Sequence, residues 1–175
     1  MGLVLACGLA GRAAAQSVHT DFDTRANFGK YHTYFSVVKT QWDNPLQERR
    51  VAEDIDSVLA AKGWQRVDRR DQADAVVAIH GATRARRELS TFYDDPGWTG
   101  WGWRRFGAGF GRSTTSVRMI PVGTMVVDIF DRQSQQLVWR GTAKADLSDN
   151  PSRNTSKDVK AVAKMFHDFP PRVHG

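Results

Sequence analysis

The sequence predicts one α+β domain, a mostly antiparallel sheet with two amphipathic helices packed on one face. Two segments, residues 44–63 and 155–169, carry apolar residues at helical spacing. β-rich runs lie before and between them, and the runs 124–131 and 137–147 have the pattern of a hairpin. Helices that are separated by successive strands indicate an α+β arrangement.

The composition is that of a globular protein. Of the 175 residues, 41% are hydrophobic and 25% are charged, which excludes extensive disorder. No apolar run has the roughly 18 residues that a spanning helix needs, so we expect no transmembrane span in the mature chain. A single cysteine excludes an internal disulfide framework and a zinc cluster. The net charge of +6 favours anionic partners.

The first fifteen residues predict an export signal. Residues 3–9 are apolar and residues 13–15 are alanines, so we expect cleavage after Ala15 and a mature domain of residues 16–175. A second interpretation is that Cys7, in a sequence resembling a lipobox, carries an acyl chain. No basic residues precede the apolar stretch, which indicates that the natural start lies upstream. Both interpretations predict a protein that is exported across the inner membrane.

The first part of the mature chain predicts two strands and a helix. Residues 18–22 and 31–38 are rich in β-branched and aromatic residues, with a turn at 27–30 between them. Asn44 and Pro45 suit the N-cap and the first position of a helix, and Gly63 suits its end. The apolar stripe of this helix is Val51, Ile55, Val58 and Leu59.

The second part predicts further strands and the second helix. Residues 64–67 and 114–120 are expected as strands, the latter ended by Pro121, and 74–82 is expected as a central strand because it is apolar on both faces. Thr155 is the expected N-cap of the second helix, which ends before Pro170. Its apolar residues are Val159, Val162, Ala163 and Phe166.

Residues 84–113 predict a loop rich in glycine, tryptophan and arginine. Glycine at this density does not hold a regular element, whereas indole and guanidinium groups are typical of contact surfaces. We therefore expect this loop to bind a partner; the alternative is that it covers an edge of its own sheet. The candidate contact residues are Trp98, Trp101, Trp103, Arg104, Arg105, Phe106, Phe110 and Arg112.

The expected partner is an envelope protein, an anionic envelope polymer or a lipid head group. Export argues against nucleic acid, although residues 105–112 superficially resemble an RNA-binding tail. No histidine has metal-ligand spacing, and no phosphate or dinucleotide fingerprint occurs, so we expect no metal and no cofactor.

Catalysis is the least favoured interpretation. His80, Asp128 and Asp131 are the candidates for a hydrolase. We expect structural roles instead: Asp128 pairs with Arg140 across the hairpin, and Asp131 starts the turn by bonding nearby backbone. Asp21 and Asp23 alone are too few ligands for calcium.

Several blocks of the mature chain are similar to one bacterial family. They are residues 18–23, 26–34, 61–64, 73–77, 123–131, 137–141 and 169–171. With these blocks the chain resembles the DUF4136 family, envelope proteins of unknown function, along essentially all of its mature length. The resemblance implies an envelope location, the periplasm or the outer-membrane periphery of a bacterium, and no assigned reaction. Many members carry a clear lipobox, which keeps lipidation at Cys7 open.

Overall fold

The computed structural model describes residues 16–40, 42–93 and 113–172, with side chains described except at 88–93 and 113–117. Six strands form one sheet in the order β1-β6-β5-β4-β2-β3. The strands and helices are β1 (Ser17–Phe22), β2 (Thr33–Val38), α1 (Pro45–Ala61), β3 (Gln65–Arg66), β4 (Ala75–Tyr93), β5 (Ser113–Asp131), β6 (Leu137–Asp146) and α2 (Pro151–Met165).

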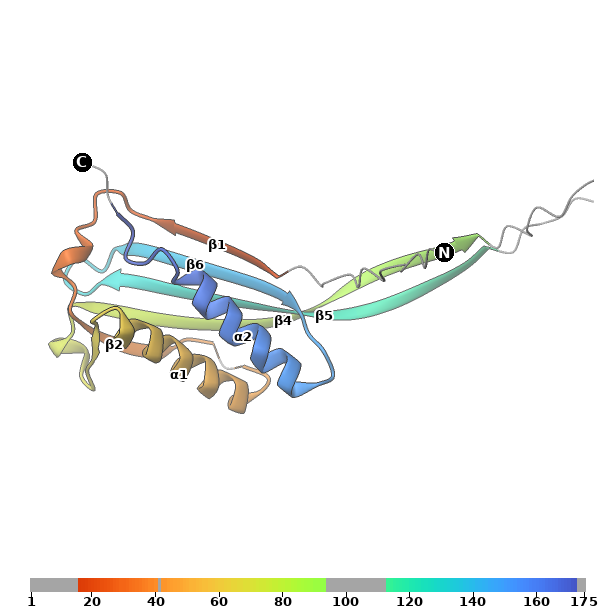
Figure 1. Cartoon of the computed structure of the whole chain (residues 1–175), viewed down its shortest axis with the longest axis horizontal. Coiled ribbons are helices and arrows are strands. Elements are labelled where there is room, and N and C mark those ends of the chain that lie inside the picture. The colour runs from red at the N-terminus through yellow and green to blue at the C-terminus, as the bar shows by residue number, and fades with distance from the viewer. Residues whose placement is uncertain (1–15, 41, 94–112, 173–175) are drawn as a thin grey trace, which may run out of the picture.

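Both helices cover the same face of the sheet (Figure 1). The neighbours in the row β1-β6-β5-β4 are antiparallel, whereas β2 runs parallel to both of its neighbours, β4 and β3. The predicted α+β fold is therefore confirmed. The parallel β2–β4 pair is possible because α1 lies between the two strands in the chain and provides the crossover.

The core lies between this helix-covered face and the two helices. Val77 and Val127 point inward from neighbouring central strands, and the α1 residues Val51, Ile55 and Leu59 pack over the sheet; all five are fully buried. An aromatic cluster extends the core towards one end, where the Trp139 and Phe166 ring centroids lie 4.8 Å apart. Such aromatic pairs contribute about 0.5–1.5 kcal/mol beyond the area they bury.

The helix boundaries follow their caps. Asn44 accepts hydrogen bonds from the Leu46 and Gln47 amides, so the predicted start of α1 is confirmed. The predicted start of α2 at Thr155 is wrong, because Asn150 caps the helix and Pro151 occupies its first turn. The Thr155 hydroxyl instead donates back to the Pro151 carbonyl, as hydroxyls inside helices do.

Strands β4 and β5 are longer than the sequence indicates. The expected strands 114–120 and 124–131 are one strand, and Pro121 does not interrupt it. The Pro121 carbonyl accepts from the Leu147 amide, which shows that the carbonyl and the nitrogen of Pro121 both face the β6 side. Because β6 has ended there, the missing N–H of proline breaks no hydrogen bond between strands. The expected loop 84–113 is wrong for residues 84–93 and 113, which are strand; residues 94–112 lie outside the described residues.

Candidate functional site

The end of β4 and the beginning of β5 extend beyond the body of the sheet as an arm. The two strands stay paired as far as Tyr93↔Ser113, whereas β6 stops pairing with β5 at Val122. From Ala85↔Pro121 outward, the arm is therefore a two-stranded ribbon (Figure 1). At about 3.4 Å per residue it projects roughly 30 Å.

Arginine dominates the described side chains of the arm and its base. By register, Arg84, Arg86 and Arg118 share one face of the ribbon, and Arg87 and Met119 share the other. The four arginines are exposed, and 53% of Met119 is exposed. Asp146 of β6 accepts from Arg86 at 3.0 Å. The arm thus presents positive charge and some apolar surface.

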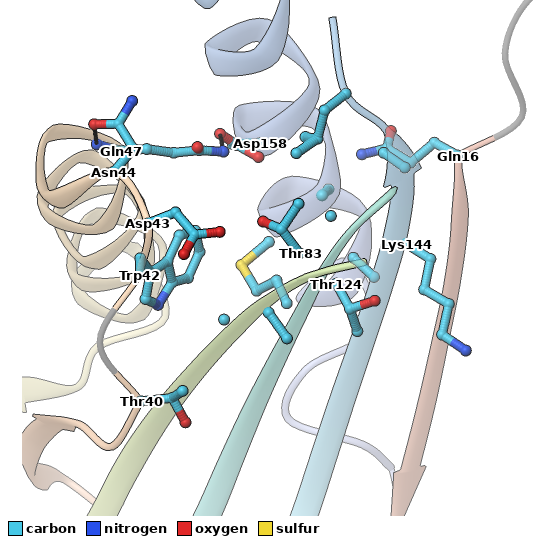
Figure 2. A pocket seen from close by; sticks show the side chains of 18 residues that line it. Gln16, Thr40, Trp42, Asp43, Asn44, Gln47, Thr83, Thr124, Lys144 and Asp158 are labelled. Carbon is cyan, nitrogen blue, oxygen red and sulfur yellow. Dashed lines mark hydrogen bonds between the residues drawn. The ribbon is translucent and has the colours of Figure 1, made fainter. Parts of the chain in front are cut away.

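A pocket of about 350 Å³ lies at the base of the arm, which we call the arm-base pocket (Figure 2). It opens between the sheet, the N-terminal end of α1 and the middle of α2, which contributes Asp158 and Ala161. It is lined by Gln16, Thr40, Trp42, Asp43, Asn44, Gln47, Gly81, Ala82, Thr83, Gly123, Thr124, Met125, Ala143, Lys144, Ala145, Leu147, Asp158 and Ala161.

Two glycines shape the floor of the arm-base pocket. A Cβ at Gly81 would lie 2.2 Å from the Trp42 ring, and a Cβ at Gly123 would lie 2.9 Å from a Leu147 methyl. Glycine is therefore required where these two side chains approach the sheet. The indole and the leucine side chain form walls above a floor of small residues.

Carboxylates dominate the charge of the arm-base pocket. Asp43 and Asp158 point into it, whereas the Lys144 ammonium group points away (Figure 2). Gln47 Nε2 donates to Asp158 Oδ2 at 2.8 Å. Burial, supported by the charge of Asp54, raises the pKa of Asp158 against the opposing effect of this hydrogen bond.

The structure places the three catalytic candidates in polar contacts that suit structural roles. Arg140 donates from Nε and Nη2 to the two oxygens of Asp128 at 2.6 and 2.8 Å, so the predicted pair is confirmed. His80 Nε2 lies 3.6 Å from Asp128 Oδ2. None of these three residues lines the arm-base pocket. His80 and Asp128 lie on the opposite face of the sheet, and Asp131 lies at the far end of β5.

Asp131 starts the β5–β6 turn as predicted. Its Oδ1 accepts from the Ser134 amide at 2.8 Å, and its Oδ2 accepts from the Tyr31 hydroxyl at 2.9 Å and pairs with Lys30. Burial by itself raises the pKa of Asp131, but these hydrogen bonds, with the Lys30 ammonium foremost, lower it well below its usual range. A carboxylate held ionised in this way is a poor general acid.

The predicted contact residues Trp98, Trp101, Trp103, Arg104, Arg105, Phe106, Phe110 and Arg112, and the candidate lipidation site Cys7, lie outside the described residues. In the parts of the chain that the structure describes, no three His, Cys, Asp or Glu side chains are grouped to hold a metal ion. No helix among the described residues is long and apolar enough to cross a bilayer. Sequence reasoning missed the arm-base pocket; the signal was the pair of glycines, Gly81 and Gly123, inside strands.

The family model of the domain of unknown function DUF4136 matches residues 18–171. The chain belongs to the DUF4136 family. This confirms the family expected from the sequence blocks. No curated protein is a significant match to this DUF4136 protein.

Solved structures share the fold of this DUF4136 protein. A DUF4136 family protein from Bacteroides thetaiotaomicron is 14% identical with a TM-score of 0.57, covering 89% of this chain and 96% of that one. A PDZ domain protein from Parabacteroides distasonis is 15% identical with a TM-score of 0.56 over 91% of this chain, which spans only 37% of that protein. The PelC dodecamer from Paraburkholderia phytofirmans is 14% identical with a TM-score of 0.55, covering 90% of this chain and 100% of that one.

Proposed function

We propose that this DUF4136 protein is a non-catalytic binding or assembly module of the bacterial cell envelope, and that the β4–β5 arm makes the contact. The observation that carries the proposal is the two-stranded ribbon that leaves the sheet beyond Ala85↔Pro121. Segment 94–112, which contains the expected contact residues, connects the end of β4 to the beginning of β5 in the sequence.

The energetics of the arm favour a partner. A two-stranded ribbon without a third strand or a covering helix is only marginally stable in water. Among the described residues no third strand pairs with the arm, so the outer backbone N–H and C=O groups of both its strands are available to another chain. A strand from a partner would satisfy these groups and cover the apolar surface at Met119.

The charge of the arm favours an acidic partner surface. Arg84 and Arg87 have no acidic partner among the described ion pairs, whereas Arg86 is paired with Asp146. Guanidinium groups bind carboxylate and phosphate in the same planar geometry. We favour an envelope protein, including a second copy of this chain, because only a polypeptide also pairs with the strand edges. The dodecameric state of PelC supports assembly among copies of a chain with this fold.

Covering its own sheet edge is the less favoured role. The described part of the arm leads away from the sheet body and from its edge strands β1 and β3 (Figure 1). This part therefore does not itself cover an edge.

Site-specific cross-linking in living cells tests the proposal. A photo-reactive residue at Arg87, on the arm, should give adducts with an envelope protein or with a second copy of the chain, identified by mass spectrometry. The control position is Arg49, which is exposed on α1. Equal or weaker cross-linking at Arg87 than at Arg49 would contradict the proposal.

The envelope location is part of the same proposal and has its own test. We propose export with removal of residues 1–15; acylation of Cys7 is the alternative. The intact mass of the protein from its native envelope should correspond to a chain that starts at Gln16. A chain starting at an acylated Cys7 would replace that proposal with membrane anchoring, and an uncleaved chain in the cytoplasm would contradict both.

A further inference from the structure

We propose that the arm-base pocket binds a small organic cation, an ammonium group carried on a short apolar body. The inference rests on the charge, the free acceptor and the shape of this pocket (Figure 2). It is independent of the partner that the arm contacts.

The charge of the arm-base pocket is opposite to that of the whole chain. The chain carries a net charge of +6. The charged side chains that line the pocket are Asp43, Asp158 and Lys144, and the Lys144 ammonium group points away from it. An entering cation therefore meets two carboxylates and no facing positive group of the lining.

The nearby helix end does not offer a site for an anion. The Asn44 side chain accepts from the Leu46 and Gln47 amides, and the Glu48 amide donates to the Asn44 carbonyl. Pro45 has no amide hydrogen. The first N–H groups of α1 are thus all satisfied, so none of them is left to donate to an anion.

Asp158 has acceptor capacity left for the ligand. Among the described hydrogen bonds its Oδ2 accepts from Gln47, a neutral amide, and its Oδ1 has no donor. No described ion pair joins Asp158 to Arg50, the basic neighbour on α1. An ionised carboxylate accepts up to about four hydrogen bonds, so an ammonium group would fill positions that the protein leaves open.

The remaining lining suits the body of such a ligand. The Trp42 ring provides an aromatic face, which attracts a cation at close range. Met125, Leu147 and Ala161 supply apolar walls, and Gly81 and Gly123 let the Trp42 and Leu147 side chains lie close against the sheet. A volume of about 350 Å³ is within the usual range for small-molecule sites.

Three small molecules that each have six carbon atoms and differ in their head group test the proposal. Hexylammonium, 1-hexanol and hexanoate are titrated into the purified protein by calorimetry, and the Trp42 indole N–H signal is followed by NMR. Hexylammonium should bind about tenfold or more tightly than hexanol, because a charge-assisted hydrogen bond is stronger than a neutral one. Equal binding of all three probes, or no binding of hexylammonium at millimolar concentration, would overturn the proposal.

Variants locate the binding. Asp158→Asn should weaken hexylammonium about tenfold or more while retaining a hydrogen bond with Gln47, and Ala145→Leu should block all probes by filling the pocket. Asp149→Asn removes the same charge from an exposed residue that does not line the pocket, and should leave binding unchanged. Equal effects of Asp158→Asn and Asp149→Asn would mean general charge attraction and would overturn the proposal. These titrations use the protein alone, so their failure is distinct from a failure of arm cross-linking.

Discussion

Asp131 and Asp158 titrate in opposite directions because their neighbours differ. Asp131 is buried, yet an ammonium group, a backbone amide and a phenol hydrogen-bond to its carboxylate and hold its pKa low. Asp158 receives one hydrogen bond from a neutral amide, and burial raises its pKa. The ionised Asp131 carboxylate therefore stabilises the native state at neutral pH, whereas ionisation of Asp158 destabilises it.

Replacing Asp131 should be strongly destabilising. Asp131→Asn removes the charge that Lys30, Tyr31 and the Ser134 amide share, and we expect a loss of about 2–3 kcal/mol in the free energy of unfolding near neutral pH. Because the folded pKa lies below the unfolded value, this contribution is present above about pH 4 and is lost as the pH falls through the folded pKa. Urea denaturation at several pH values measures it. A loss that did not shrink on acidification would contradict this explanation.

Replacing Asp158 should have the opposite pH dependence. Its folded pKa lies above the unfolded value, so the contribution of Asp158 to the free energy of unfolding is most favourable below about pH 4 and becomes less favourable as the pH rises through the folded pKa. The charges of Asp54, Arg50 and Lys157 also act on this carboxyl group, the first raising its pKa and the other two lowering it. Asp158→Asn should gain melting temperature relative to wild type between acidic and neutral pH. A gain that did not increase with pH would contradict the assigned shift.

At the scale of elements, caps decide where the helices begin. Both helices start at an Asn-Pro pair, Asn44-Pro45 and Asn150-Pro151. The first pair is sufficient to predict α1. At α2 the sequence also offers Thr155 with an acidic residue three positions later, and this competing cap pattern led to the wrong start.

Two alanine variants test the start of α2. Asn150→Ala removes the acceptor for the Ser152 and Arg153 amides and should cost about 1 kcal/mol of unfolding free energy. Thr155→Ala should cost less, since its hydroxyl only bonds the Pro151 carbonyl inside the helix. Chemical denaturation compares them, and a larger cost for Thr155→Ala would favour the later start.

The arm should be separable from the fold. Replacing residues 85–121 by Asn-Gly between Arg84 and Val122 gives a two-residue hairpin turn at a position where those residues are paired. We expect an essentially unchanged melting temperature, because the buried core lies in the body of the sheet and the helices. Loss of folding would show that the arm belongs to the stabilising core, and would contradict its role as a separate contact element.

At the scale of the whole molecule, α2 and the sheet meet at a glycine. A Cβ at Gly141 would lie 2.3 Å from Met165 Cγ and 2.6 Å from the Trp139 ring. Gly141→Ala should therefore cost about 1–3 kcal/mol through overpacking. In a Met165→Ala background the added cost should be smaller, and a double-mutant cycle measures this coupling. Additive effects would show that Met165 is not the obstructing group.

Much of the body was predictable because each element has a local cause. The stripe Val51, Ile55 and Leu59 identified α1, and the Asp128–Arg140 pair followed from hairpin register. The arm was not predictable, because Arg84, Arg86 and Arg87 leave no apolar alternation on a ribbon that faces water on both sides. The arm-base pocket was not predictable, because Asp158 and Gln47 are 111 positions apart in the chain.

By itself the sequence determined the family, the fold class and most of the helices and strands, since periodicity, caps and turn residues act over short distances. Only the tertiary structure decided that β4 and β5 continue past the sheet as an arm, and that two helices and two strand glycines enclose a pocket lined by carboxylates. These features arise from strand register and from the close approach of distant side chains, which a local pattern does not encode.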